Sequence, residues 1–281
     1  MAGMTHLAPA VPGRLSRRRF ACSLPLAGLV GAVLPPGAIV RAQSAPPLPA
    51  AVADWFPRQD PALAAEVVGV SHRDLNRVRE LVERQPNLAK AAIDWGYGDW
   101  ESALGAASHT GRREIAEFLI AHGAQPTLFS AAMLGQLAVV RAWVETSPGI
   151  QKTPGPHAIT LLAHARAGGA DAAAVVAYLQ QVGDADTRPA TVALAPADRD
   201  AVVGRYVFGT GPRDHLTVDV RNDVPGIERP GASRQLLFHT GGLVFFPSGV
   251  PSVRIAFERG SGPATSLTVA DPEVLVTARR A

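Results

Sequence analysis

Cysteine is almost absent from this chain of 281 residues, which contains only Cys22. A disulfide needs two thiols and a cysteine-rich zinc site needs several, so the sequence supplies neither. No residue after Cys22 can act as a thiolate nucleophile or ligand. The fold of the remaining chain must therefore be stabilised by burial of apolar side chains, and hydrophobic residues make up 47% of the sequence.

Acidic residues are absent from residues 1–42, which contain five arginines. The whole chain has 27 basic and 24 acidic residues, so residues 43–281 contain 22 basic and 24 acidic ones. A nucleic-acid-binding protein needs a concentrated basic surface that displaces counterions from the phosphates. The charge balance of residues 43–281 therefore predicts no nucleic-acid partner.

The usual motifs of enzyme and metal chemistry are also absent. The chain has no glycine-rich phosphate loop, no His-Glu-x-x-His pair and no Gly-x-Ser-x-Gly motif. Asp94, Asp99, His109 and His122 could in principle gather near one metal ion, but their spacing is not diagnostic. His109 and His164 lie inside helical units, where packing is the default role. The sequence therefore predicts no catalytic residue, no metal site and no cofactor.

An arginine-rich segment precedes an apolar stretch over residues 21–40. The segment reads Ser-Arg-Arg-Arg-Phe and is defined by Ser16, Arg17, Arg18 and Phe20. It resembles a twin-arginine export signal, which implies a bacterial protein that folds before export and works in the periplasm. Small side chains favour cleavage after Ala42. Retention of residues 21–40 as a membrane anchor is the alternative, which three prolines in the stretch disfavour. Contact with the membrane is expected through the signal alone.

Composition and hydrophobic periodicity divide the chain into five segments. They are a signal over 1–42, a Pro/Ala-rich linker over 43–60, a helical domain over 61–186, a linker over 187–195 and a β-domain over 196–281.

A Leu-Ala-Gly pattern recurs in the helical segment. The three copies are Leu104–Ala107–Gly111, Leu128–Ala131–Gly135 and Leu162–Ala165–Gly169. A small residue permits a close helix crossing, and a glycine after a helix supplies a left-handed turn. The copy at residues 102–126 resembles an ankyrin repeat, with Ser-Ala-Leu in place of Thr-Pro-Leu and a Gly-Ala at its end. The resemblance implies a solenoid that binds protein partners. The glycine spacings of 24 and 34 residues, and the 37 residues from Asp74 to Gly111, depart from the family period of about 33. Another kind of α-solenoid is the alternative.

The C-terminal segment is predicted to form short strands separated by turn residues. The expected strands are residues 204–208, 216–220, 235–239, 243–246, 253–257, 266–269 and 274–277. Such strands are typical of a small antiparallel barrel or sandwich. The Val-Gly-Arg-Tyr sequence at 203–206 and the pair Phe245 and Phe246 resemble the small β-barrel domain appended to some β-lactamase-related serine hydrolases. The Ser-x-x-Lys motif of those hydrolases is absent, so no catalysis is implied.

The expected fold class is α+β multidomain, an ankyrin-like α-solenoid followed by a small antiparallel β-barrel or sandwich.

An aromatic and acidic segment precedes the first clear repeat and is predicted to project as a binding finger. Its candidate binding residues are Asp94, Trp95, Tyr97, Asp99, Trp100 and Glu101. Aromatic side chains on a rigid loop are typical of interface hot spots, and the acids suit a basic protein partner. Burial of both tryptophans under the loop is the alternative.

The predicted function is a non-catalytic periplasmic binding or scaffolding protein. The alternative is an enzyme or enzyme accessory with a site between the two domains.

Overall fold

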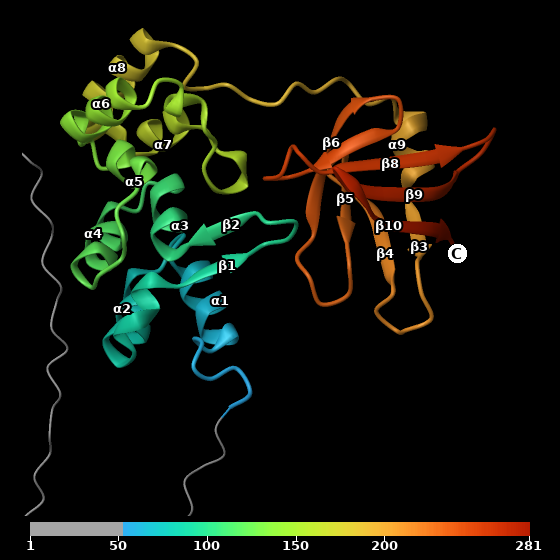
Figure 1. The fold of residues 1–281 in the computed structure, drawn as a ribbon, viewed down its shortest axis with the longest axis horizontal. Helices are drawn as coiled ribbons and strands as arrows, with labels where there is room; N and C mark the ends of the chain where they lie inside the picture. The colour runs from blue at the N-terminus through green and yellow to red at the C-terminus, as the bar shows by residue number, and fades with distance from the viewer. Residues whose placement is uncertain (1–52) are drawn as a thin grey trace, which may run out of the picture. The chain divides into compact units, whose positions relative to one another are not determined.

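Helices occupy the first half of the residues that the computed structural model describes, 53–281, and strands occupy the second half (Figure 1). The α-helices are α1 (Pro61–Val70), α2 (Leu75–Arg84), α3 (Ala103–His109), α4 (Arg113–Ala121), α5 (Leu128–Met133), α6 (Leu137–Thr146), α7 (Leu161–Ala167), α8 (Ala173–Val182) and α9 (Pro196–Val202). Short 3-10 helices are η1 (Pro86–Lys90), η2 (Ile150–Lys152), η3 (Pro156–Ala158) and η4 (Gly169–Ala172). The predicted export signal and its cleavage site lie outside the described residues.

Side-chain caps fix where several of these helices begin. The carboxylates of Asp60 and Asp74 accept backbone N–H groups at the first turns of α1 and α2. Ser102 and Thr160 cap α3 and α7 in the same way. Each cap satisfies a backbone donor that the helix itself leaves without a partner. These four polar residues therefore fix where their helices begin.

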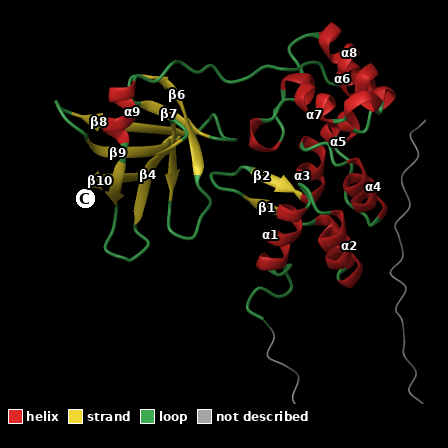
Figure 2. Cartoon of the chain, turned by 180° about the vertical axis from the view of Figure 1, so that it is seen from behind, coloured by secondary structure: helices red, strands yellow, loops and turns green. Residues whose placement is uncertain are grey.

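A hairpin of two strands lies among the helices, as Figure 2 shows. It consists of β1 (Ala92–Asp94) and β2 (Trp100–Ser102), paired antiparallel. Residues 96–98 form its turn, and all three have positive φ angles of 131°, 58° and 86°. Glycine adopts such angles without steric cost, whereas Tyr97 does not. The hairpin runs directly into α3, because Ser102 ends β2 and also caps the helix.

The prediction of an ankyrin-like α-solenoid is wrong. The described residues form nine short α-helices, of six to ten residues each, separated by 3-10 turns and a hairpin, with no solenoid of repeats. The small residues of the sequence pattern are buried, as expected, at Ala107, Ala131 and Ala165. A small residue at a crossing and a glycine after a helix are needed by any closely packed pair of short helices. The recurring pattern is therefore explained by the packing of individual helix pairs. Its copies are unequally spaced and do not form equivalent stacked units.

The expected β-barrel is present in the C-terminal half. Its strands are β3 (Gly204–Val207), β4 (His215–Arg221), β5 (Val224–Glu228), β6 (Gln235–Gly241), β7 (Val244–Pro247), β8 (Arg254–Arg259), β9 (Ala264–Asp271) and β10 (Glu273–Arg280). Each strand pairs antiparallel with its neighbour in sequence, and pairing of β10 with β3 closes the barrel. Closure leaves no free sheet edge among these eight strands.

The barrel core is filled by alternating inward side chains. Tyr206, Phe245 and Phe257 form edge-to-face aromatic contacts with ring centroids 5.6–5.7 Å apart. The Tyr206 hydroxyl donates to the backbone carbonyl of Val202, 2.8 Å away, at the end of α9. This bond satisfies a buried polar group and attaches the helix to the barrel.

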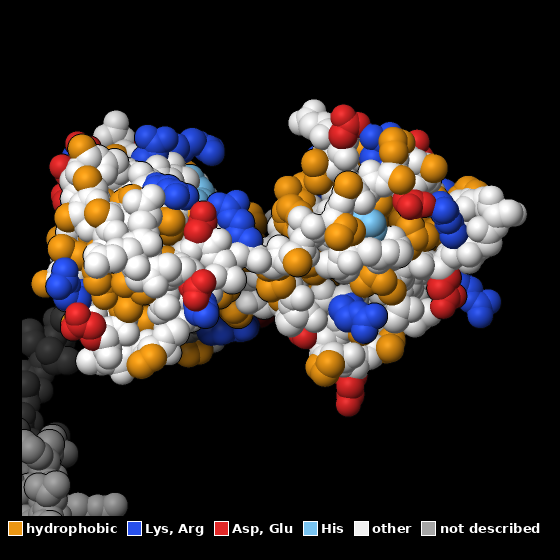
Figure 3. All heavy atoms as spheres, turned by 90° about the horizontal axis from the view of Figure 1, so that it is seen from above, with side chains coloured by type: hydrophobic (Ala, Val, Ile, Leu, Met, Phe, Trp, Pro, Cys, Tyr) orange, Lys and Arg blue, Asp and Glu red, His pale blue; other side chains and the backbone are white. Residues whose placement is uncertain are grey.

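The surface of the described residues carries charges of both signs. On the face drawn in Figure 3, Lys and Arg side chains are interspersed with Asp and Glu. None of the helices formed by residues 53–281 is long and apolar enough to cross a membrane. All of these residues belong to one compact unit.

Candidate metal centre

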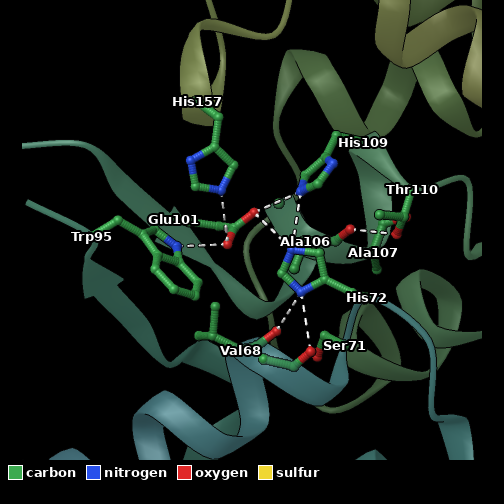
Figure 4. A network of polar contacts seen from close by, with 12 residues as sticks. Val68, Ser71, His72, Trp95, Glu101, Ala106, Ala107, His109, Thr110 and His157 are labelled. Carbon is green, nitrogen blue, oxygen red and sulfur yellow. Dashed lines mark hydrogen bonds and ion pairs between the residues drawn. The ribbon is translucent and has the colours of Figure 1, made fainter. Parts of the chain in front are cut away.

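Four segments of the helical half bring three histidines and one glutamate together. These residues are His72, Glu101, His109 and His157 (Figure 4). Each offers one nitrogen or oxygen atom, and the four atoms lie within 4.8 Å of one another. We refer to this group as the His3Glu cluster.

His72 lies in the turn that ends α1. The Ser71 hydroxyl donates to the Val67 carbonyl at 2.7 Å, which stabilises the last turn of the helix. The Nδ1 atom of His72 lies 3.2 Å from the Val68 carbonyl and 3.1 Å from that of Gly69. A carbonyl can only accept a hydrogen bond, so Nδ1 is the donor in these contacts. The turn therefore aims the other ring nitrogen, Nε2, into the cluster.

Glu101 lies at the centre of β2, and the pleat of this strand determines its direction. Successive side chains of a strand point to opposite faces. Trp100 is accordingly 62% exposed, whereas Glu101 is fully buried. The indole N–H of Trp95 donates to Glu101 Oε2 at 2.8 Å, and Oε1 faces His72 and His109. A buried carboxylate is stable only where it has partners, and the cluster provides them.

His109 occupies the last position of α3, eight residues after Glu101. Its Nε2 lies 2.8 Å from Glu101 Oε1 and 3.2 Å from His72 Nε2. Because Ser102 caps the start of α3, the register of this short helix is fixed relative to β2. The carboxylate and the imidazole are thus positioned by one continuous piece of chain.

His157 comes from a loop between α6 and α7, and Asp99 holds it in place. The Asp99 carboxylate accepts the backbone N–H of His157 at 2.8 Å and lies 2.6 Å from its Nδ1. His157 adopts a left-handed conformation with φ of 59°, which is unusual for a residue other than glycine. Its Nε2 lies 3.4 Å from Glu101 Oε2. A carboxylate behind a ligating histidine is a frequent support of metal sites, because it fixes the ring orientation.

The distances within the His3Glu cluster suit a tetrahedral ion. Zinc binds imidazole nitrogen and carboxylate oxygen at about 2.0–2.1 Å, which separates tetrahedral ligand atoms by about 3.3 Å. His72 Nε2 lies 3.2 Å from His109 Nε2 and 3.6 Å from Glu101 Oε1, and His157 Nε2 lies 3.4 Å from the other carboxylate oxygen, Oε2. His109 Nε2 and Glu101 Oε1 are closer, at 2.8 Å. Small movements of these side chains would bring the four ligand atoms, which lie within 4.8 Å of one another, to tetrahedral separations.

The cluster also attracts positive charge. Burial raises the pKa of Glu101, but hydrogen bonds from His109 and His157 outweigh it and lower that pKa to about 2. Burial lowers the pKa of His157, but hydrogen bonds with Asp99 and Glu101 outweigh it and raise that pKa to about 9. The two carboxylates thus favour a cation at the position of the His157 imidazole. A metal ion would replace the proton on Nε2.

The four residues that the sequence suggested for a metal site do not lie together in the structure. His109 belongs to the His3Glu cluster, and Asp99 supports it. The Asp94 carboxylate instead accepts the N–H groups of Gly96 and Gly98 in the hairpin turn. His122 packs against Phe118, with ring centroids 4.1 Å apart, and its Nδ1 lies 2.8 Å from the Phe118 carbonyl. Sequence reasoning did not consider the other three members of the cluster, His72, Glu101 and His157, for a metal site.

The residues of the predicted binding finger face different surroundings. Asp94 and Trp100 are exposed, whereas Asp99 and Glu101 are buried. Trp95 packs against the helical core, and Tyr97 packs against the barrel core. Asp99, Trp95 and Glu101 therefore have partners within the chain. Trp100 is the large exposed side chain of the finger.

His164 lies fully buried behind the cluster. Its Nδ1 is 2.8 Å from the hydroxyl of Ser108, which is also fully buried, and its ring packs against Phe129. Burial and the nearby His109 lower the pKa of His164 to about 3 against a smaller opposing effect of Glu101. A neutral, packed histidine fits these surroundings.

Comparisons with protein families, with curated proteins and with solved structures find no match for the chain.

Proposed function

We propose that the chain binds one zinc ion through the His3Glu cluster. One observation carries this proposal: four potential ligand atoms from four separate segments lie within 4.8 Å of one another. The hydrogen bonds of His72 Nδ1 to carbonyls and of His157 Nδ1 to Asp99 further support it, because they leave both Nε2 atoms directed inward. Such contacts fix the orientation of the ring and are common behind metal-binding histidines.

The ligand set and its geometry favour zinc among the common metals. Magnesium and calcium prefer six or more oxygen ligands, and copper(II) and nickel(II) prefer square arrangements. Three imidazoles and one carboxylate at tetrahedral spacing suit zinc. Four protein ligands occupy every position of a tetrahedral ion, which is typical of structural sites. The ion would tie the end of α1, the hairpin, α3 and the loop of His157 together.

A competition titration tests this proposal. The protein is treated with a chelator, freed of it, and titrated with zinc against a chromophoric chelator of known affinity. We expect one equivalent to bind, and His109→Gln to weaken binding by at least about 100-fold. His215→Gln, a histidine of the barrel, is the matched control and should bind as the unaltered protein does. Failure of the unaltered protein to bind zinc would overturn the proposal.

We also propose that the protein reaches the periplasm by the twin-arginine route. The support is the arginine pair in residues 16–20, and a route that carries folded proteins suits a chain that acquires its metal first. The double variant Arg17→Lys, Arg18→Lys keeps the charge but removes the guanidinium pair. Its precursor should accumulate in the cytoplasm. Normal periplasmic levels of the double variant would count against this route.

One observation favours a second function, binding of a protein partner at Trp100. This side chain is 62% exposed beside a groove of about 490 Å³ lined by Phe129, Pro154 and Pro156. Exposed tryptophan next to an apolar groove is typical of interface hot spots. A periplasmic pull-down with Trp100→Ala tests this function, and the variant should lose partners that the unaltered protein captures. Equal capture by both proteins would exclude Trp100 as the binding residue.

A further inference from the structure

A cavity of about 370 Å³ lies at one end of the barrel. The barrel side of its wall is largely apolar, with Phe208, Leu216, Ile227, Val269 and Val276, and its polar members are Glu228, Arg229, Ser233 and Gln235. The interior of an eight-stranded barrel holds either packed side chains or one small ligand, and this cavity lies at the end of the packed core. Ligand sites in proteins have volumes of about 300–1,000 Å³, so this cavity is large enough for a small molecule.

A β-bulge places an additional apolar side chain at the mouth of the cavity. In the pairing of β10 with β9, Val274 lies opposite Ala270 and Val276 lies opposite Val269, so Leu275 is the extra residue. Leu275 lines the cavity although it is 59% exposed. Bulges redirect side chains at the rims of barrels and beside binding sites. An exposed leucine at a cavity mouth is suited to contact an apolar ligand.

The charged groups at the mouth indicate that the ligand is uncharged. The Arg229 guanidinium lies over the Phe208 ring at 5.2 Å, and its Nη2 is 3.6 Å from the Asp214 carboxylate. Its Nε–H donates to the Arg213 carbonyl at 3.1 Å. Arg229 is thus engaged within the chain, and Glu228 at the same wall would repel an anion.

The tip of the β1–β2 hairpin forms the remaining wall. Trp95, Gly96 and Tyr97 line the cavity, and Tyr97 packs against the barrel core. The side-chain amide of Gln235 donates to the Trp95 carbonyl at 2.7 Å, which attaches the hairpin to β6. Tyr97 keeps this position although its φ of 58° is strained for a residue with a side chain. Strain of this kind persists where surrounding contacts hold it, and it is concentrated at functional sites.

We propose that the barrel binds a small, uncharged, largely apolar molecule in this cavity, with Tyr97 forming one wall over it. The volume, the apolar lining, the redirected Leu275 and the internally paired Arg229 all favour this class of ligand. The cavity and the His3Glu cluster are separate sites that share the β1–β2 hairpin: Trp95 lines the cavity, and its indole N–H donates to Glu101 Oε2.

Fluorescence titration with N-phenyl-1-naphthylamine tests the proposal. This neutral apolar dye becomes fluorescent when it leaves water, and the full chain is titrated with it. Leu275→Glu places a charge at the cavity mouth and should weaken binding by at least about tenfold. Val274→Glu is the matched control: it is adjacent on β10, is 63% exposed and does not line the cavity. It should change the affinity by less than about twofold.

Tyr97→Ala tests the wall formed by the hairpin. Removal of the ring takes away apolar contact area, so dye binding should weaken by about tenfold or more. Circular dichroism melting establishes that each variant is folded. Absence of dye binding to the unaltered protein, or equal affinities of Leu275→Glu and Val274→Glu, would overturn the proposed site. Unchanged or tighter binding by Tyr97→Ala would overturn the role of the tyrosine.

Discussion

Glu101→Gln removes the negative charge of the His3Glu cluster but keeps the size and shape of the side chain. Glutamine has nearly the same volume and keeps an oxygen that can accept the indole N–H of Trp95, which lies 2.8 Å from Glu101 Oε2. It removes the negative charge that His109 and His157 contact. We therefore expect a folded protein whose affinity for zinc is at least about 100-fold lower.

The magnitude follows from the linkage between binding and folding. A ligand that binds only the folded state at 100 times its dissociation constant stabilises that state by about 2.7 kcal/mol. For about 150–250 residues, each kcal/mol shifts the melting temperature by about 2–4 °C, so zinc should raise it by about 5–11 °C. At the same zinc concentration, the weakened Glu101→Gln variant should gain only about 0.4 kcal/mol, which corresponds to less than about 2 °C.

The assay is thermal unfolding followed by circular dichroism, with zinc and with chelator, for each protein. His122→Gln is the control, because His122 lies outside the His3Glu cluster and its Nδ1 contacts only the Phe118 carbonyl. It should show the full zinc-dependent increase of the unaltered protein. An equal increase in Glu101→Gln would refute the assignment of this carboxylate as a ligand.

Three further predictions concern stability. Because burial lowers the pKa of His164 to about 3, the unfolded chain, with an ordinary pKa near 6.5, binds a proton more readily. The free energy of unfolding should therefore fall by about 2–3 kcal/mol as the pH is lowered from 6.5 to 4.5. The measurement is the urea midpoint at each pH, and His164→Gln should reduce this fall. Ala107→Leu should overpack a fully buried position and cost about 1–3 kcal/mol, whereas exposed Asn76→Ala should be nearly neutral; equal melting temperatures would contradict this packing. Trp95→Ala should cost about 3–5 kcal/mol because the ring packs on the helical core, whereas exposed Trp100→Ala should leave the unfolding midpoint almost unchanged.

The barrel strands were largely predictable from sequence, with one informative exception. Strand β5 was missed because its sequence, Val-Pro-Gly-Ile-Glu, contains two residues that disfavour strands. In the structure, Pro225 pairs with Val220, and the Arg234 side chain packs against Gly226 so closely that a Cβ atom would not fit. A side chain at this position would displace the Arg234 guanidinium, which donates to Asp219, and a propensity argument cannot detect such a contact between distant residues.

The helical half shows what a repeated pattern does and does not determine. Gly111 and Gly135 both follow helices with positive φ, as expected, and both approach the backbone of a later element too closely for a Cβ atom. Gly111 contacts Ala167, and Gly135 contacts Asp171. These are requirements of individual helix contacts. They do not impose the equal spacing on which a solenoid depends.

The proposed metal centre could not be predicted because the four residues of the His3Glu cluster come from separate segments and none has a typical ligand spacing. His72 follows a helix, and His157 lies in a loop rich in proline and glycine, 85 residues later. Glu101 was interpreted as a surface acid, but the pleat of β2 turns it inward while Trp100 remains outside. The useful signal would have been the alternation of Trp100 and Glu101 in a short strand leading into the helix of His109.

X-ray absorption spectroscopy at the zinc edge of the zinc-loaded protein tests the central claim most directly. The His3Glu cluster predicts four nitrogen and oxygen ligands at about 2.0–2.1 Å, with the outer-shell scattering of three imidazole rings. A first shell of six oxygen atoms, or a spectrum without imidazole scattering, would contradict the assignment of this cluster as the metal centre.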